Sequence, residues 1–166
     1  MKRLLISAAA IAATVSFAQA QDAEAIYSVK MLTPDTALEA ASAALASCRD
    51  EGYQVAVSVV DRSGVEQVTL RDRFAGPHTP ETARRKAWTA VSFRTDTLDL
   101  GKQTETGEAW AIRGIPNALP LGGGVLIRAG DGSMLGAIGI SGAPGGSLDA
   151  DCANAGIAAI EDAIAF

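Results

Sequence analysis

The chain has 166 residues, of which 48% are hydrophobic, enough to bury a core without metal or disulfide support. Its formal net charge is −5. This acidic balance argues against nucleic acid and against an anionic membrane surface as partners.

The first twenty residues have the organisation of a secretory signal peptide. Lys2 and Arg3 precede an apolar run that ends in a small-residue cleavage site at Ala20. That run is shorter than the roughly 20 residues needed to span a bilayer, although an uncleaved anchor is the alternative. We therefore expect residues 1–20 to be removed, which leaves one domain, residues 21–166, with a net charge of −7. Such a protein would be periplasmic or secreted, with no membrane insertion after cleavage.

The next segment predicts a helix. Thr33 is a suitable N-cap, Pro34 fits the first helical position, and Asp35 adds an acid to the first turn. Apolar residues then recur at helical spacing as far as Cys48, and Gly52 is placed to end the helix. We expect this helix to lie on the core.

Two β-hairpins are predicted further along the chain. Residues 53–60 alternate valines on one face, and a polar turn separates them from a second strand at 65–70. The other hairpin joins 125–128 to 134–141. Glycines inside its second strand indicate that another part of the protein packs close to the backbone there.

Helices are predicted between and after the hairpins. Thr79-Pro80 resembles the first helix start, with Thr79 as N-cap, and a last helix begins near Leu148. Residues 101–120 have little apolar periodicity and are left unassigned. Because the strands come as tight pairs, we expect an α+β fold: an antiparallel sheet of about four to five strands flanked by helices.

The two cysteines fall in the first and last predicted helices. Cys48 lies in the last turn of one and Cys152 in the first turn of the other, so antiparallel packing would bring them together. An exported protein meets an oxidising compartment, which permits a disulfide. The alternative is two buried, unpaired thiols. The spacing contains no pattern typical of a zinc site.

Positive charge is concentrated around the second helix. Six basic residues fall within 24 positions and only two acids oppose them, a local excess of about +4 in an acidic chain. This excess favours an anionic ligand. The alternative is that the three consecutive cations point about 100° apart and form the solvated side of a helix. The six are Arg71, Arg73, Arg84, Arg85, Lys86 and Arg94.

His78 is the only histidine and precedes Thr79 at the helix start. The free N–H groups and the positive dipole end there favour an anion and disfavour an imidazolium. A neutral imidazole ligates iron or acts as a base, and nearby arginines would pair with carboxylates such as haem propionates. The alternative is a loop histidine that is hydrogen-bonded to backbone.

Three consecutive glycines, Gly122, Gly123 and Gly124, precede the second hairpin. They lack the Gly-Lys-Ser/Thr that would complete a phosphate-binding loop. They either form a loop entering a strand or line the floor of a pocket, where they would let a ligand approach the backbone. A Ser/His/Asp hydrolase is disfavoured, because the chain has a single histidine.

Several segments together resemble a known family. "VAVSVVDRSGVEQVTLRDRFAGPHTPETARRKAWTAVSF", "LGGGVLIRAGDGSMLGAIGISGAPGG" and "DADCANAGIAAI" are similar to the GlcG/HbpS family of haem-degrading domains, from about residue 32 to 164. The resemblance implies a profilin-like α/β sandwich that forms homo-oligomers. It also implies haem binding in some members and an extracellular branch. The run from Arg71 to Thr79 departs from the commoner family pattern, so no haem ligand is transferred from it.

We therefore expect an exported binding module for haem or a related small anionic cofactor, with His78 or Thr79 approaching the iron. One alternative is a metal-free enzyme acting on a small hydroxy or oxo acid, with Arg71 holding the carboxylate and His78 as base. Another is a structural or sensory subunit of an oligomer. The predicted ligand-binding set is His78, Thr79, Arg71, Arg73, Arg84, Lys86, Gly122, Gly123 and Gly124.

Overall fold

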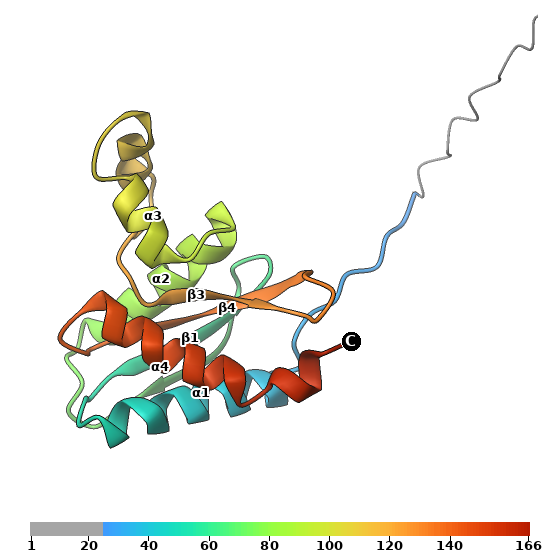
Figure 1. Ribbon diagram of the computed structural model, residues 1–166, viewed down its shortest axis with the longest axis horizontal. Helices are drawn as coiled ribbons and strands as arrows, with labels where there is room; N and C mark the ends of the chain where they lie inside the picture. The colour runs from blue at the N-terminus through green and yellow to red at the C-terminus, as the bar shows by residue number, and fades with distance from the viewer. Residues whose placement is uncertain (1–24) are drawn as a thin grey trace, which may run out of the picture.

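An antiparallel sheet of four strands is the centre of the computed structural model, which describes residues 25–166 (Figure 1). The predicted signal peptide lies outside the described residues. The two predicted hairpins are confirmed, and pairing of β1 with β4 joins them into one sheet with the order β2-β1-β4-β3. The strands are β1 (Ala56–Asp61), β2 (Glu66–Arg71), β3 (Gly124–Arg128) and β4 (Met134–Ser141).

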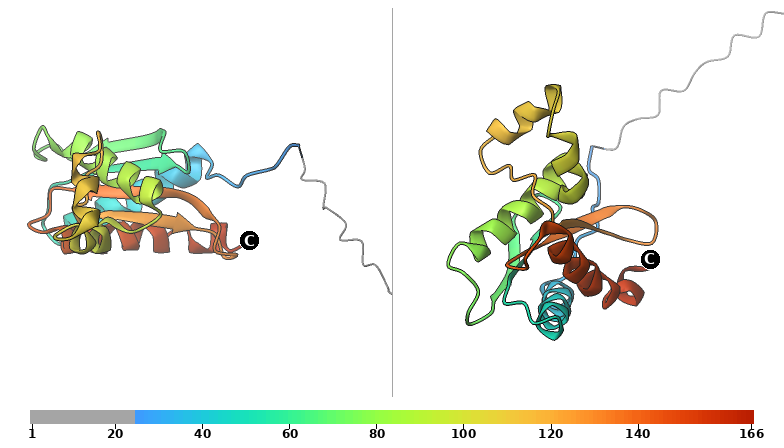
Figure 2. Two further views of the ribbon diagram at one scale, coloured as in Figure 1. Left: turned by 90° about the horizontal axis from the view of Figure 1, so that it is seen from above. Right: turned by 60° about the vertical axis from the view of Figure 1, so that its left-hand side comes forward.

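Helices cover both faces of this sheet (Figure 2), which confirms the predicted α/β sandwich. On one face, the alternating valines of β1 pack with α1 (Pro34–Asp50) and α4 (Gly146–Ala158). On the other face, Val60 and Leu126 pack against α2 (Thr79–Phe93). Among residues 25–166, no helix has both the length and the apolar character that a bilayer span requires.

The two similar helix starts differ in structure. Thr33 caps α1 as predicted, because its side chain accepts a hydrogen bond from the Thr36 amide at 3.2 Å. In α2 the N-cap is His78, whose backbone is already helical, so Thr79 is the first helical residue. The predicted capping role of Thr79 is therefore wrong by one position. Its hydroxyl instead donates to the Gly76 carbonyl at 2.8 Å.

A glycine of β4 lets α2 approach the sheet closely. A Cβ added at Gly139 would overlap the carbonyl of Ala83 and the amide of Ala87 on α2. The small residues on the inner face of α2 complete this contact. This explains the glycine at position 139 of the strand, because the backbone of α2 occupies the space that a side chain there would need.

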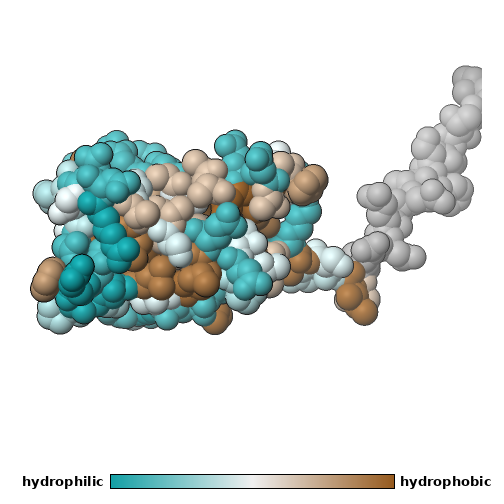
Figure 3. Space-filling view, turned by 90° about the horizontal axis from the view of Figure 1, so that it is seen from below, coloured by the Kyte–Doolittle hydropathy of each residue, from teal (hydrophilic) through white to brown (hydrophobic). Residues whose placement is uncertain are grey.

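The segment that the sequence leaves unassigned projects from the sheet (Figure 1). It contains the 3₁₀ helix η1 (Glu108–Gly114) and follows α3 (Thr97–Gln103), whose last three residues overlap it. Trp110 in η1 is 62% exposed. After α4, the chain does not continue as one helix but ends in a second 3₁₀ helix, η2 (Glu161–Ile164). Figure 3, a view from below, shows apolar side chains grouped in the middle of this face and surrounded by polar ones.

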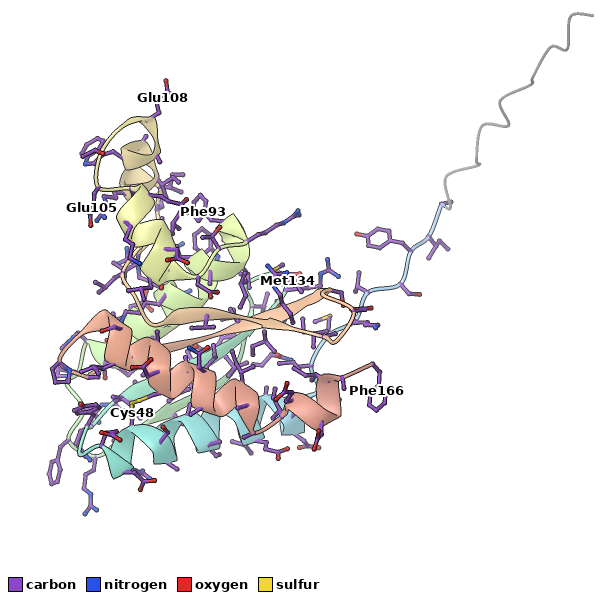
Figure 4. The ribbon with its side chains drawn as sticks, in the orientation of Figure 1. Cys48, Phe93, Glu105, Glu108, Met134 and Phe166 are labelled. Atoms are coloured by element: carbon purple, nitrogen blue, oxygen red, sulfur yellow. A yellow bond between two sulfur atoms is a disulfide. The ribbon has the colours of Figure 1, made fainter. Side chains whose placement is uncertain are left out.

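The predicted disulfide is confirmed. Cys48 and Cys152 are bonded, with their Cα atoms 5.5 Å apart, and the bond joins α1 to α4 on one face of the sheet (Figure 4). Both side chains are buried, so this cross-link lies within the larger of the two cores.

Candidate functional site

The loop between β2 and α2 presents the imidazole of His78 at the surface. His78 occupies the N-cap position of α2, is exposed, and makes no capping hydrogen bond through its side chain. Its ring lies against Gly76, where an added Cβ would come within 2.7 Å of the imidazole Cε1 atom. Glycine at position 76 therefore leaves room for the imidazole, which remains available for a ligand.

Two guanidinium groups share this loop with His78. Arg71 donates a hydrogen bond to the Ala75 carbonyl, which draws the loop together. Arg73 lies over the ring of Phe74, 5.5 Å from its centroid, and Phe74 is 77% exposed. Within residues 25–166, neither Arg71 nor Arg73 forms an ion pair with a carboxylate. The loop therefore carries uncompensated positive charge and an exposed aromatic ring that the sequence analysis did not select.

Asp72 anchors this loop to α1. Its side chain is 5% exposed and accepts hydrogen bonds at 2.9 Å from Nε of Arg49 to both carboxylate oxygens. Hydrogen bonding from Arg49 holds the pKa of Asp72 below its ordinary value. The flanking Arg71 and Arg73 point outward while Asp72 points inward, so the anchor fixes the stretch that presents them.

The anchor makes stability depend on acid pH. Because the pKa of Asp72 is lower in the folded state than in the unfolded state, its contribution is complete above the unfolded value of about 4. That contribution is lost as the pH falls through the folded pKa. We expect the native protein to lose more unfolding free energy than Asp72→Asn between about pH 5 and pH 2, as measured by urea unfolding. Equal losses in the two proteins would contradict this role.

Two other predicted cations already have partners. Arg84 forms a surface ion pair with Glu81 at 2.7 Å. Lys86 is 1% exposed, and its Nζ donates to Oδ2 of Asp149 at 2.7 Å and to the Ile140 carbonyl at 2.9 Å. Burial lowers the pKa of Lys86 and raises that of Asp149, while their mutual attraction opposes both shifts. The Lys86 charge is therefore compensated inside the protein.

The predicted glycines also belong to the interior. A Cβ at Gly123 would meet Cβ of Asp149 and Nζ of Lys86, and one at Gly124 would overlap the Lys86 carbonyl. The space that a Cβ at Gly122 would need is likewise occupied by atoms of Leu98 and Gly146. Protein atoms, rather than a ligand, make the close approach that these glycines permit. Thr79, which is also buried, uses its hydroxyl within the loop.

The structure therefore divides the predicted site into two parts. His78, Arg71 and Arg73 share an exposed loop, whereas Lys86 and the three glycines pack inside. No group of three or more histidine, cysteine, aspartate or glutamate side chains within residues 25–166 is arranged to hold a metal ion. A ligand that brings its own metal, such as haem, needs only one axial side chain from the protein, and His78 is suited to that role.

Residues 32–158 match a family model described as haem-degrading protein HbpS-like. A double mutant of Streptomyces reticuli HbpS is 38% identical, with a TM-score of 0.77, and the match covers 92% of this chain and 97% of that one. The PduOC–haem complex is 32% identical with a TM-score of 0.71, and the match covers 78% of this chain and 95% of that one.

A curated relative extends beyond this domain. The corrinoid adenosyltransferase PduO of Salmonella typhimurium is 40% identical over 113 residues, which cover 64% of this chain and 32% of that protein. This chain thus spans about a third of the length of the relative.

Proposed function

We propose that this chain, which belongs to the family of haem-degrading HbpS-like proteins, is an exported protein that binds haem or a closely related anionic cofactor. The observation that carries the proposal is the exposed His78 on one loop with two guanidinium groups that have no carboxylate partner among residues 25–166. A haem complex of a relative that is 32% identical supports it.

Different residues of this loop would bind the iron and the carboxylates of the haem. His78 would ligate the iron, because its imidazole is exposed while the Thr79 hydroxyl is buried and already hydrogen-bonded. Arg71 and Arg73 would pair with the propionates, since a guanidinium matches a carboxylate geometrically. The exposed ring of Phe74 adds an apolar surface beside them. Bound haem supplies redox-active iron to such a site.

Hemin titration tests these roles. We expect the protein to shift the Soret band of hemin, and His78→Ala to bind hemin at least about tenfold more weakly with an altered band position. Arg73→Gln should weaken binding by about three- to tenfold, because one charge-assisted hydrogen bond is lost. Lys102→Gln, which removes an exposed charge on α3, is the matched control and should bind hemin as the native protein does. An unchanged spectrum on adding hemin would refute the proposal.

An exposed imidazole on one loop with two guanidiniums that form no ion pair within residues 25–166 also suits a metal-free enzyme. In that case Arg71 would hold the carboxylate of a small hydroxy or oxo acid and His78 would act as base. Proton exchange measured across a panel of such acids separates the two functions. Exchange that disappears in His78→Ala, without a hemin spectrum, would favour the enzyme.

Assembly and export are further parts of the proposal. Exposed apolar side chains, among them Phe74, Trp110 and Ile115, suit contacts between copies of the chain. Chromatographic sizing with and without hemin would detect a homo-oligomer and any dependence of its size on the ligand. The signal peptide suggested by the sequence would leave Gln21 as the first residue, which mass spectrometry of exported protein would identify.

A further inference from the structure

A second cationic site lies at the opposite end of α2 from His78. Three arginines line a hollow of about 270 Å³ there, together with Ser133 and Met134. Arg62 comes from the β1–β2 turn, Arg94 directly follows α2, and Arg128 ends β3. Since α2 has fifteen residues, this arginine pocket lies about 22 Å from the helix start. Figure 4 marks its side of the molecule with Met134 and with Phe93, the last residue of α2.

The three guanidiniums have no acidic partner in the part of the chain that the structure describes. None of them lies within 4.0 Å of a carboxylate oxygen. The neighbouring Asp61 instead accepts backbone hydrogen bonds from Ser63 and Val65. Asp131 pairs with Lys30 at 2.7 Å. Nη1 of Arg128 donates to the Gly132 carbonyl at 3.2 Å, but the three positive charges have no carboxylate counterion among residues 25–166. An anion in the hollow would supply one.

A hydroxyl in the wall of the pocket also lacks a partner. Oγ of Ser133 is buried and makes no hydrogen bond with any of residues 25–166. The residue itself is fixed, because its amide donates to Oδ1 of Asp131 at 2.9 Å and its carbonyl accepts from Ala129. A buried hydroxyl normally finds a partner, and rotation of the Ser133 side chain toward the hollow would let this one donate to a bound oxygen atom.

The backbone at Arg94 gives a third indication. Arg94 has φ 53° and ψ 34°, the left-handed conformation that follows many helices and that glycine adopts most easily. An arginine there carries a conformational cost that glycine would avoid. A cation near the C-terminal end of α2 is favourable, but one guanidinium is enough for that, whereas three arginines line this hollow.

We infer that the arginine pocket binds a small oxyanion with at least two negative charges, such as a phosphate monoester or a dicarboxylate. Guanidinium forks match the oxygens of both classes, and three of them balance a dianion better than a monoanion. The hollow is smaller than the pockets that enclose drug-sized ligands, which suits a compact anion. This site is separate from the loop of His78, so its test does not depend on haem binding.

Calorimetric titration of the full protein with inorganic phosphate, and separately with succinate, tests the inference. We expect saturable binding that weakens as sodium chloride is added. Arg128→Gln and Arg62→Gln should each weaken it by about tenfold or more. Lys102→Gln, on the exposed surface of α3, should leave it unchanged. Tighter phosphate binding assigns the site to phosphate esters, and tighter succinate binding assigns it to dicarboxylates.

Arg94→Gly separates binding from folding. Glycine relieves the left-handed backbone, so the thermal midpoint should stay the same or rise while affinity for the preferred anion falls by about tenfold or more. Failure of the native protein to bind either anion up to about 10 mM would overturn the inference. Binding by Arg94→Gly and Arg128→Gln that is as strong as binding by the native protein would also overturn it.

Discussion

Replacing Lys86 with methionine is expected to lower the free energy of unfolding by about 3–5 kcal/mol. The substitution retains most of the side-chain volume but leaves the Asp149 carboxylate buried without its counterion. Lys86 also connects three elements, because it extends from α2 to a carbonyl of β4 and to the first turn of α4. Removing the ammonium therefore leaves both a charge and a carbonyl unsatisfied in the interior.

A double variant and a surface variant make this prediction specific. Lys86→Met combined with Asp149→Leu should recover part of the lost stability, because no buried charge remains. Recovery should be incomplete, since the Asp149 carboxylate also accepts a hydrogen bond from the Ala143 amide at 3.0 Å. Arg84→Met, which breaks the exposed pair with Glu81, should cost less than about 1 kcal/mol. Urea unfolding measures all three, and a single Lys86→Met variant as stable as the native protein would contradict the pairing.

Local patterns predicted much of the fold because they have local causes. The alternating valines of β1 could bury one face only as a strand, and the Thr33-Pro34 start fixed the beginning of α1. The predicted range for β4, residues 134–141, agrees with the structure. The segment 101–120 could not be predicted, since it projects from the sheet and lacks the apolar periodicity that burial imposes.

Long-range partners explain why the site was predicted less completely. Lys86 lies three positions after Ala83 and four before Ala90, so its place on the buried stripe of α2 was detectable from spacing. Its partner Asp149 was not, because nothing local relates residues 63 positions apart. The arginine pocket is similar: Arg94 belongs to the predicted cationic cluster, but only the sheet topology brings Arg62 and Arg128 to it.

Reducing the Cys48–Cys152 disulfide is expected to lower the free energy of unfolding by about 4 kcal/mol. The two residues are 104 positions apart, so the bond restricts most of the unfolded chain, and its loss increases the entropy of that state. The denatured chain should also expand, which would increase the dependence of stability on urea concentration. Urea unfolding with and without a reductant gives both quantities.

The Cys48→Ala/Cys152→Ala double variant distinguishes the cross-link from packing. Both sulfur atoms are buried, so alanine adds a small cavity, and this variant should be less stable than the reduced native protein by about 1 kcal/mol. Its unfolding should not respond to reductant. The entropic contribution of the disulfide would be contradicted if reduction of the native protein exposed free thiols without changing the midpoint of urea unfolding. Because the bond joins the last turn of α1 to the middle of α4, its loss should loosen the α1–α4 face and leave the packing of α2 on the opposite face largely intact. Hydrogen exchange resolved by residue would show that difference between the two faces.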